Sequence, residues 1–280
     1  MERSNEIKEK NALYLIASPI GNINDISYRA IETLKSLNYL FCEDTRVTQK
    51  LLSHYGISLP LDSYHDYSDK VKEDKIISLL KEGNNVGIIS DSGTPIISDP
   101  GFEVVKKALE ENIKVIPIPG ASAQVSALIS SGLSPKPYLF YGFLDHKISK
   151  KRSEIEQLSS YPFTMVFYES PKRINETLLL MKEVLKERKV FVYREITKVF
   201  EEYIRLDLKE AESFPNDLKG EMVIVLEGKK EDYCNNIDII AEMNKIINDG
   251  YSVKEAAKML SIKCSMKSSD IYNEYQRGRK

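Results

Sequence analysis

Short runs of apolar residues alternate with longer amphipathic stretches between residues 13 and 130. A short apolar run fits a buried strand, and apolar positions spaced along one face fit a helix. In residues 25–37, for example, Ile31, Leu34 and Leu37 fall on one helical face. The whole pattern predicts strands at 13–17, 39–42, 86–90 and 114–118, and helices at 25–37, 45–55, 69–82 and 102–111. Strands and helices in alternation indicate a mostly parallel sheet with helices on both faces.

The rhythm breaks at residues 132–137, Gly-Leu-Ser-Pro-Lys-Pro, which predict an exit from this first α/β domain. Further strands are expected at 164–168, 190–194, 203–208 and 222–226, with a helix at 172–185. Two successive strands without a helix between them favour a hairpin, and therefore a mixed sheet in a second α/β domain. The predicted organisation is a disordered lead-in at 1–11, α/β domains at 12–131 and 132–230, and a helical tail at 236–280.

The tail has the features of a small helical unit. Ser252 and Glu255 have the spacing of a capping box, which predicts the start of a short helix carrying Ala256, Ala257 and Leu260. A second short helix is expected over 269–275. Two short helices with a brief connection resemble a helix-turn-helix. The alternative interpretation is a helical hairpin that only covers the second domain.

Composition changes this picture little. The chain has 280 residues, of which 42% are hydrophobic and 29% charged, as in a soluble globular protein. No apolar run approaches the roughly 20 residues that cross a bilayer, and residues 1–11 lack the apolar core of a signal peptide, so we expect a cytoplasmic protein. The net charge of −2 does not by itself indicate a nucleic-acid partner. Residues 147–152 and 252–280 are locally basic, which fits either phosphate contacts or a solvated surface.

Cysteine and histidine usage predicts no metal site. The three cysteines, Cys42, Cys234 and Cys264, are far apart and odd in number, which disfavours both disulfides and zinc. Cys42 lies in an apolar run, so we expect a buried structural thiol. The three histidines are scattered along the chain.

Three loops that follow predicted strands share an unusual composition. They are residues 18–22 (Ser-Pro-Ile-Gly-Asn), 91–95 (Asp-Ser-Gly-Thr-Pro) and 119–123 (Pro-Gly-Ala-Ser-Ala). Glycine, proline and small hydroxyl residues leave backbone N–H groups free to face a ligand, although they also simply turn the chain. None of the loops matches GxGxxG or GxxxxGK[ST], which disfavours the usual dinucleotide and triphosphate sites. Because ligands bind at the carboxyl ends of strands in such sheets, we expect a shared pocket.

In this order and spacing the three loops resemble the tetrapyrrole methylase superfamily, the class III S-adenosylmethionine-dependent methyltransferases. More narrowly, the chain is similar to the family of ribosomal RNA small subunit methyltransferases in that superfamily. The motifs that carry this likeness are residues 18–22, 43–46 (Glu-Asp-Thr-Arg), 90–95, 141–144 (Tyr-Gly-Phe-Leu), 167–170 (Phe-Tyr-Glu-Ser), 194–198 (Arg-Glu-Ile-Thr-Lys) and 220–222 (Gly-Glu-Met). The resemblance runs from about Ala12 to Gly228.

The resemblance implies that S-adenosylmethionine binds in a cleft between the two domains and that the enzyme 2′-O-methylates a cytidine in the decoding region of small-subunit ribosomal RNA. It also implies that this RNA, within an assembling ribosomal subunit, is the partner and that the protein is a homodimer. It further implies cofactor contacts, mostly through backbone atoms, at Pro19, Ile20, Thr94, Ser122, Ala123, Tyr168 and Met222. The chemistry of the residues agrees: the Asp91 carboxylate can accept from ribose hydroxyls or the ammonium group, and N–H groups after Gly120 suit the carboxylate. Strand packing is the simpler interpretation of Tyr168 and Met222.

Methyl transfer to a ribose hydroxyl needs an aligned acceptor oxygen and gains from a base that takes its proton. Candidates for this catalytic work are Glu43 and Asp44, with His65 as a further candidate, and Arg46 could instead pair with a phosphate or a carboxylate. The alternative for Asp44 is a helix cap. The sequence does not choose among these residues.

Two other functions fit parts of the pattern. A small-molecule, tetrapyrrole-type methyltransferase would share the fold, since fold alone does not determine function. A non-catalytic protein that senses S-adenosylmethionine could use the tail to bind nucleic acid. The motifs at 43–46 and 168–170 and the basic tail argue against the small-molecule enzyme. Methyl incorporation into RNA would distinguish the RNA enzyme from a sensor, which would show none.

Overall fold

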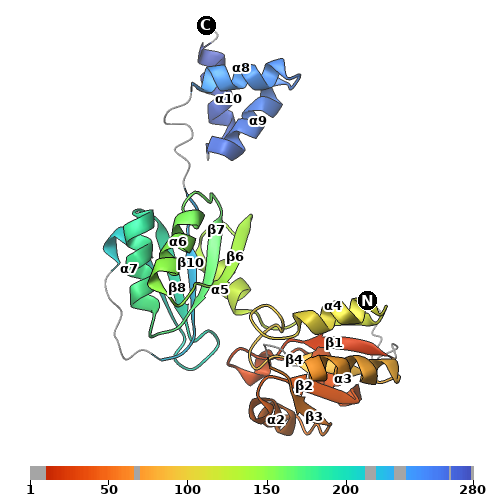
Figure 1. Ribbon diagram of the computed structural model, residues 1–280. Helices are drawn as coiled ribbons and strands as arrows, with labels where there is room; N and C mark the ends of the chain where they lie inside the picture. The colour runs from red at the N-terminus through yellow and green to blue at the C-terminus, as the bar shows by residue number, and fades with distance from the viewer. Residues whose placement is uncertain (1–10, 66–69, 212–218, 230–237, 265, 279–280) are drawn as a thin grey trace.

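The computed structural model describes residues 11–65, 70–211, 219–229, 238–264 and 266–278. It contains two α/β units and a bundle of C-terminal helices (Figure 1). The expected lead-in at 1–11 lies outside the described residues except for Asn11.

The first sheet is entirely parallel, as the alternating pattern predicts. Its strand order is β3-β2-β4-β1-β5. The strands are β1 (Ala12–Ile16), β2 (Tyr39–Cys42), β3 (Leu61–Ser63), β4 (Val86–Ile89) and β5 (Lys114–Ile118). β3 was not predicted, because its three residues are only partly buried and carry Asp and Ser.

Helices cover both faces of this sheet. On one face α1 (Tyr28–Ser36) and α2 (Thr45–His54) bury Leu34 and Leu52 in one apolar cluster. On the other face α3 (Lys70–Lys81) and α4 (Phe102–Glu110) bury Leu80 and Val104 in a second cluster. A 3-10 turn, η1 (Ile23–Asp25), and the cap of α1 by Ser27 explain why this helix begins later than its apolar pattern predicts.

The second sheet is mixed, with strand order β6-β7-β10-β8-β9. Its strands are β6 (Tyr138–Phe143), β7 (Thr164–Glu169), β8 (Lys189–Arg194), β9 (Glu202–Asp207) and β10 (Met222–Leu226), with the 3-10 turn η2 (Leu208–Glu210) after β9. β6 runs parallel to β7, β10 runs antiparallel to β7 and β8, and β8 and β9 form the expected antiparallel pair.

Helices pack on both faces of the second sheet as well. α6 (Ile148–Leu158) and α7 (Ile174–Leu185) bury Ile155 and Leu178 on one face. α6 was not predicted, because its sequence is largely polar and one of its inward positions is Lys151. On the other face lies α5 (Ala123–Ser131), whose Ala127 and Leu128 join Val166 and Val223. α5 therefore follows the last strand of the first sheet but packs on the second.

The tail forms its own small core. α8 (Ile239–Asn248), α9 (Val253–Cys264) and α10 (Ser268–Gly278) bury Met243, Leu260 and Tyr275 together. The predicted capping box is present, since Ser252 N–H donates to Glu255 Oε2 at 2.9 Å and Glu255 N–H donates to Ser252 Oγ at 3.3 Å. Among the described residues, no helix has the length and apolar character that a membrane crossing requires.

Candidate functional site

The three loops singled out in the sequence lie together at the carboxyl ends of β1, β4 and β5, which are neighbours in the first sheet. Ser18 N–H donates to Gly93 O at 2.9 Å, and Gly93 N–H donates to Ser18 Oγ at 3.1 Å. The Thr94 hydroxyl donates to Ala121 O at 3.2 Å. These bonds tie both the 18–22 loop and the 119–123 loop to the 91–95 loop, so the three loops form one rigid rim.

A cavity of about 510 Å³ lies between this rim and the second sheet. Residues of the first unit, α5 and the second sheet all contribute to its wall. They include Ile20, Glu43, Thr94, Ser122, Ala123, Gln124, Phe143, Tyr168, Glu169, Gly220, Glu221 and Met222. We call this space the donor cavity. Its size is typical of a small-molecule site.

Most of the predicted cofactor residues line the donor cavity, namely Ile20, Thr94, Ser122, Ala123, Tyr168 and Met222. Pro19 and Asp91 instead line a neighbouring cavity of about 450 Å³ between α2 and the 18–22 loop. We call this second space the side cavity. The two cavities share Ile20, Ser92 and Glu221, so they adjoin.

Asp91 is half-buried where β4 ends. Its Oδ1 accepts from the backbone N–H of Asp44 at 3.0 Å, which links the end of β4 to the start of α2. Burial raises the pKa of Asp91, and the nearby Asp44 charge adds to this while the Asp44 N–H and His65 oppose it. A carboxylate with a raised pKa accepts a proton more readily than an ordinary aspartate.

The candidates for catalysis are arranged very differently from one another. Glu43 lines the donor cavity. Asp44 caps α2, accepting from Arg46 N–H at 2.8 Å, and also binds the Arg46 guanidinium through both oxygens at 3.0 and 2.6 Å. These bonds lower the pKa of Asp44 to about 2. The capping role that the sequence left open is therefore present in the structure, and Arg46 lies on the exposed side of α2.

Tyr168 and Gln124 both line the donor cavity. The Tyr168 ring lies edge-on to Phe140 and Phe143, with ring centroids 5.0 and 5.5 Å away. Burial raises the pKa of the Tyr168 hydroxyl, and the Gln124 backbone opposes this shift. Gln124 was not predicted as a site residue. Its side-chain Oε1 is buried and has no hydrogen-bond partner among the described residues.

Glu169, the last residue of β7, has a buried carboxylate that binds the turn after this strand. Glu169 accepts from Ser170 N–H at 2.8 Å, from Arg173 Nε at 2.7 Å and from the Thr177 hydroxyl at 2.6 Å. Lys151, which is completely buried, donates to Thr177 Oγ1 at 3.1 Å and to Glu176 at 2.6 Å. This network fixes the turn from β7 into α7 beside the cavity.

The two α/β units also contact each other through the 18–22 loop and residues 196–198. Asn22 N–H donates to Thr197 Oγ1 at 3.0 Å, and a Cβ added at Gly21 would lie 2.4 Å from Lys198 Cγ. Glu195 accepts from Lys198 Nζ at 2.8 Å and from Glu221 N–H at 3.1 Å. Three of the motifs noted in the sequence are thus in contact.

Comparison with known proteins agrees with this geometry. A model of the tetrapyrrole (corrin/porphyrin) methylases matches residues 12–212. The chain is 40% identical over 272 residues to the ribosomal RNA small subunit methyltransferase I of Bacillus subtilis, covering 94% of this chain and 93% of that one. It is 39% identical to the protein of the same name from Haemophilus influenzae, covering 93% and 94%.

The chain belongs to the tetrapyrrole methylase family and, within it, to the ribosomal RNA small subunit methyltransferase I family. Solved structures confirm the fold. The methyltransferase CobJ superposes with a TM-score of 0.59 at 15% identity, covering 78% of this chain and 95% of that one. A uroporphyrin-III-C-methyltransferase from Thermus thermophilus gives 0.54 at 16% identity, covering 78% and 94%. The protein is an S-adenosylmethionine-dependent methyltransferase, and the fold predicted from the sequence is confirmed.

The donor cavity fits the cofactor of this family. The orphaned Gln124 Oε1 offers an acceptor for an amine, such as the adenine amino group or the ammonium group. At the first turn of α5 Ser122 makes no side-chain cap, so backbone N–H groups there remain for a carboxylate. The sequence signal that could have identified Gln124 is a long polar residue in the first turn of a helix that follows a predicted ligand loop.

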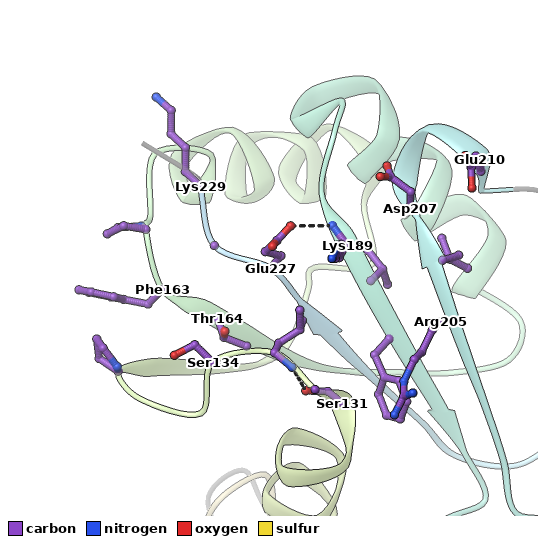
Figure 2. Close-up of a pocket in the computed structure, with 18 of the residues that line it drawn as sticks. Ser131, Ser134, Phe163, Thr164, Lys189, Arg205, Asp207, Glu210, Glu227 and Lys229 are labelled. Carbon is purple, nitrogen blue, oxygen red and sulfur yellow. Dashed lines mark hydrogen bonds between the residues drawn. The ribbon is translucent and has the colours of Figure 1, made fainter. Parts of the chain in front are cut away.

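Another cavity, of about 1140 Å³, lies elsewhere in the described part of this methyltransferase. It sits near the start of β7 and β8 and the ends of β9 and β10 (Figure 2), and its lining contains no residue of the sequence motifs. Its basic residues Lys189, Arg205 and Lys229 are balanced by Asp207, Glu210 and Glu227. Arg205 is held by Ser130 O at 3.0 Å and lies over the Phe191 ring. Balanced charge and this position do not favour an anionic ligand or substrate there.

The basic stretch at 147–152 is largely neutralised. Lys150 pairs with Asp145 at 3.5 Å, buried Lys151 with Glu176 at 2.6 Å, and Arg152 with Glu183 at 2.5 Å. This stretch therefore supports α6 and its packing more than it offers free charge to phosphates.

Cysteine and metal chemistry contribute little here. No group of metal-binding side chains occurs in the described parts of the chain. Cys42 is a buried free thiol, as predicted. The expectation of no disulfides was wrong, because Cys264 is disulfide-bonded.

Proposed function

We propose that this methyltransferase 2′-O-methylates a cytidine ribose in small-subunit (16S) ribosomal RNA. The observation that carries the proposal is the extent of the similarity. The relatives named for small-subunit ribosomal RNA match 93–94% of this chain, which leaves too few residues unmatched to omit the helical tail. The uroporphyrin methyltransferase matches 78%, and the family model ends at residue 212. The tail thus accompanies the RNA-named relatives.

In this proposal the cofactor occupies the donor cavity. Ile20, Thr94, Ser122, Ala123, Tyr168 and Met222 surround it, and Gln124 supplies the buried acceptor. S-adenosylmethionine, when bound, supplies a methyl group activated by its sulfonium charge. The rigid rim and the aromatic wall around Tyr168 hold the reactants in place and exclude water, which is the main contribution that such a displacement needs.

The candidates for a base are not equally suited. The pKa of Asp44 is about 2 and both of its oxygens bind Arg46, so Asp44 is a weak proton acceptor and acts as a cap and an anchor for Arg46. Glu43 lines the donor cavity, and Asp91 combines a raised pKa with a place in the side cavity. A base at either position would contribute about 10²–10⁴-fold to turnover.

The tail fits a role in holding RNA. On α9 Lys254 and Lys258 are one helical turn apart and exposed, and Lys267 and Arg277 are exposed nearby. α10 carries Asp270 and Glu274, so the cationic side chains gather mainly on α9 and in the connection to α10. Neutralising phosphates through such residues gives sequence-independent affinity.

The cellular setting follows from the same proposal. The protein would act in the cytoplasm, as a homodimer, on ribosomal RNA within an assembling subunit. Exposed Val199, Phe200 and Tyr203 beside the β8–β9 hairpin offer apolar surface for a second copy. Sedimentation of the purified protein at micromolar concentration tests this: a single monomeric species would refute the homodimer.

The acceptor atom is tested by methylating small-subunit RNA with labelled S-adenosylmethionine and hydrolysing the product in alkali. A 2′-O-methyl group blocks cleavage at its own phosphodiester, so the label is expected in a resistant dinucleotide containing cytidine. Label in mononucleotides would place the methyl on a base. No incorporation into RNA, with cofactor binding intact, would favour a small-molecule methyltransferase or a sensor.

A further inference from the structure

The side cavity has no assigned role, and its walls differ from those of the donor cavity. Its apolar lining includes Ile23, Val47 and Leu51, and Val47 is 42% exposed. Its lining also carries polar and charged groups, including Lys50, Asp91 and Lys198. Apolar side chains combined with polar and charged groups suit a nucleobase and its ribose, and the volume of about 450 Å³ falls in the range of small-ligand sites.

A cationic groove continues from this cavity over the outer side of α2. Its lining is Thr45, Arg46, Gln49, Lys50, Ser53, His54 and Leu61. The Arg46 guanidinium is paired with Asp44, so Lys50 supplies the net positive charge of the groove. Lys50 and His54 line both the groove and the side cavity, so the two are continuous. Lys50 is exposed and makes no ion pair with any described residue, in contrast to the paired cations at 147–152. Its charge is available to a phosphate.

Asp91 completes the arrangement. Its Oδ1 is occupied by the Asp44 N–H, and its Oδ2 accepts no hydrogen bond from the described residues. This carboxylate lies beside Ser92, which lines both cavities. A hydroxyl of a ligand in the side cavity can therefore donate to Asp91 close to the boundary with the donor cavity.

We propose that the side cavity receives the nucleotide to be methylated and that the adjoining groove on α2 holds the phosphates of the same RNA strand. This inference rests on the proposed function and adds the path of the RNA. The base lies on Ile23, Val47 and Leu51, the ribose faces Asp91, and Lys50 contacts the backbone. The strand thus reaches the site along the first α/β unit, and the tail binds RNA separately.

The first test concerns Lys50 and uses the full chain with a fluorescent transcript of small-subunit RNA. Lys50→Ala removes one phosphate contact, so affinity should fall several-fold and the slope of log K against log salt should shrink by about 0.7–0.9. The control is Lys106→Ala, an exposed lysine on α4, which covers the opposite face of the first sheet. An unchanged salt slope in Lys50→Ala, or an equal loss of RNA affinity in both variants, would overturn the assignment of the groove to RNA phosphates.

The second test fills the side cavity. Val47→Trp should keep RNA affinity and S-adenosylmethionine affinity within about twofold, while methyl transfer falls at least about tenfold, since the nucleotide cannot enter. The matched control is Val71→Trp, which changes an exposed residue of α3. Transfer at the wild-type rate in Val47→Trp, or a loss of cofactor affinity there, would overturn the assignment. If the wild type itself binds the cofactor but neither binds nor methylates RNA, it is the proposed function that fails.

Discussion

A single buried carboxylate, Glu169, fixes the turn that carries Tyr168 to the donor cavity. Its side chain is 1% exposed and accepts from a guanidinium, a hydroxyl and a backbone N–H. Removing one partner of a buried ion pair leaves the other partner desolvated and uncompensated, which costs more than the pair itself contributes.

We expect Glu169→Ala to lower the free energy of unfolding by about 3 kcal/mol, because Arg173 and Thr177 lose their shared acceptor. Urea denaturation measures this. Glu183→Ala is the control, since its ion pair with Arg152 is exposed and should leave the denaturation midpoint unchanged. Equal midpoints for Glu169→Ala and the wild type would show that the network does not stabilise the fold.

The charge of the half-buried Asp91 should lower the stability of the folded protein. Because burial raises its pKa above the unfolded value, the stability linked to its protonation is present at low pH and is lost as pH rises through the folded pKa. Asp91→Asn keeps an Oδ1 acceptor for Asp44 N–H but carries no charge. The variant should gain stability relative to the wild type from pH 4 to pH 8 in urea titrations.

Asp91→Asn also tests whether Asp91 contacts the methyl acceptor or the cofactor. If Asp91 faces the acceptor, Asp91→Asn lowers methyl transfer while calorimetry shows S-adenosylmethionine affinity within about twofold of the wild type. A loss of cofactor affinity on the order of 1–3 kcal/mol would instead support the cofactor contact expected from the Asp91 carboxylate.

At the scale of elements, the site depends on loops from different units meeting without side-chain clashes. Gly220 has φ +99°, and a Cβ there would lie 2.1 Å from Glu195 Oε1. Glu195 is the residue that holds Lys198 and the backbone of Glu221. Displacing the Glu195 carboxylate would therefore shift Glu221, which lines both the donor cavity and the side cavity.

Gly220→Ala should weaken S-adenosylmethionine binding by about tenfold, or roughly 1.4 kcal/mol. Gly250→Ala provides a close control, because Gly250 has φ +98° but no atom of the described residues lies within 4 Å of an added Cβ. Both variants strain the backbone similarly, so only the clash distinguishes them. Equal cofactor affinities by calorimetry would show that the contact with Glu195 does not shape the cavity.

At the scale of the whole molecule, cofactor binding and RNA holding are carried by different parts of the chain. The residues that line the donor cavity all precede residue 224, and the tail has its own core. Truncation after Gly228 should therefore leave S-adenosylmethionine affinity intact while RNA binding weakens and its salt dependence decreases. An identical salt slope in the truncated and full-length proteins would assign the tail a purely structural role.

Much of the fold was predictable because burial leaves a periodic trace in the sequence. The runs at 39–42 and 114–118 and the capping box at Ser252 are strong local signals, and each corresponds to an observed element. β3 and α6 were missed for the opposite reason. β3 is short and half-buried, and α6 conceals a buried Lys151 that looks like a surface residue until its partners are known.

The sequence by itself determined the alternating α/β architecture, the three ligand loops and their position at strand ends, since these depend on local patterns of burial and turn chemistry. Tertiary structure alone decided which side chains share a cavity. It placed Asp91 beside α2, engaged Asp44 as a cap, left Gln124 Oε1 without a partner and packed α5 on the second sheet. Such outcomes depend on contacts between residues distant in sequence, and no local pattern records them.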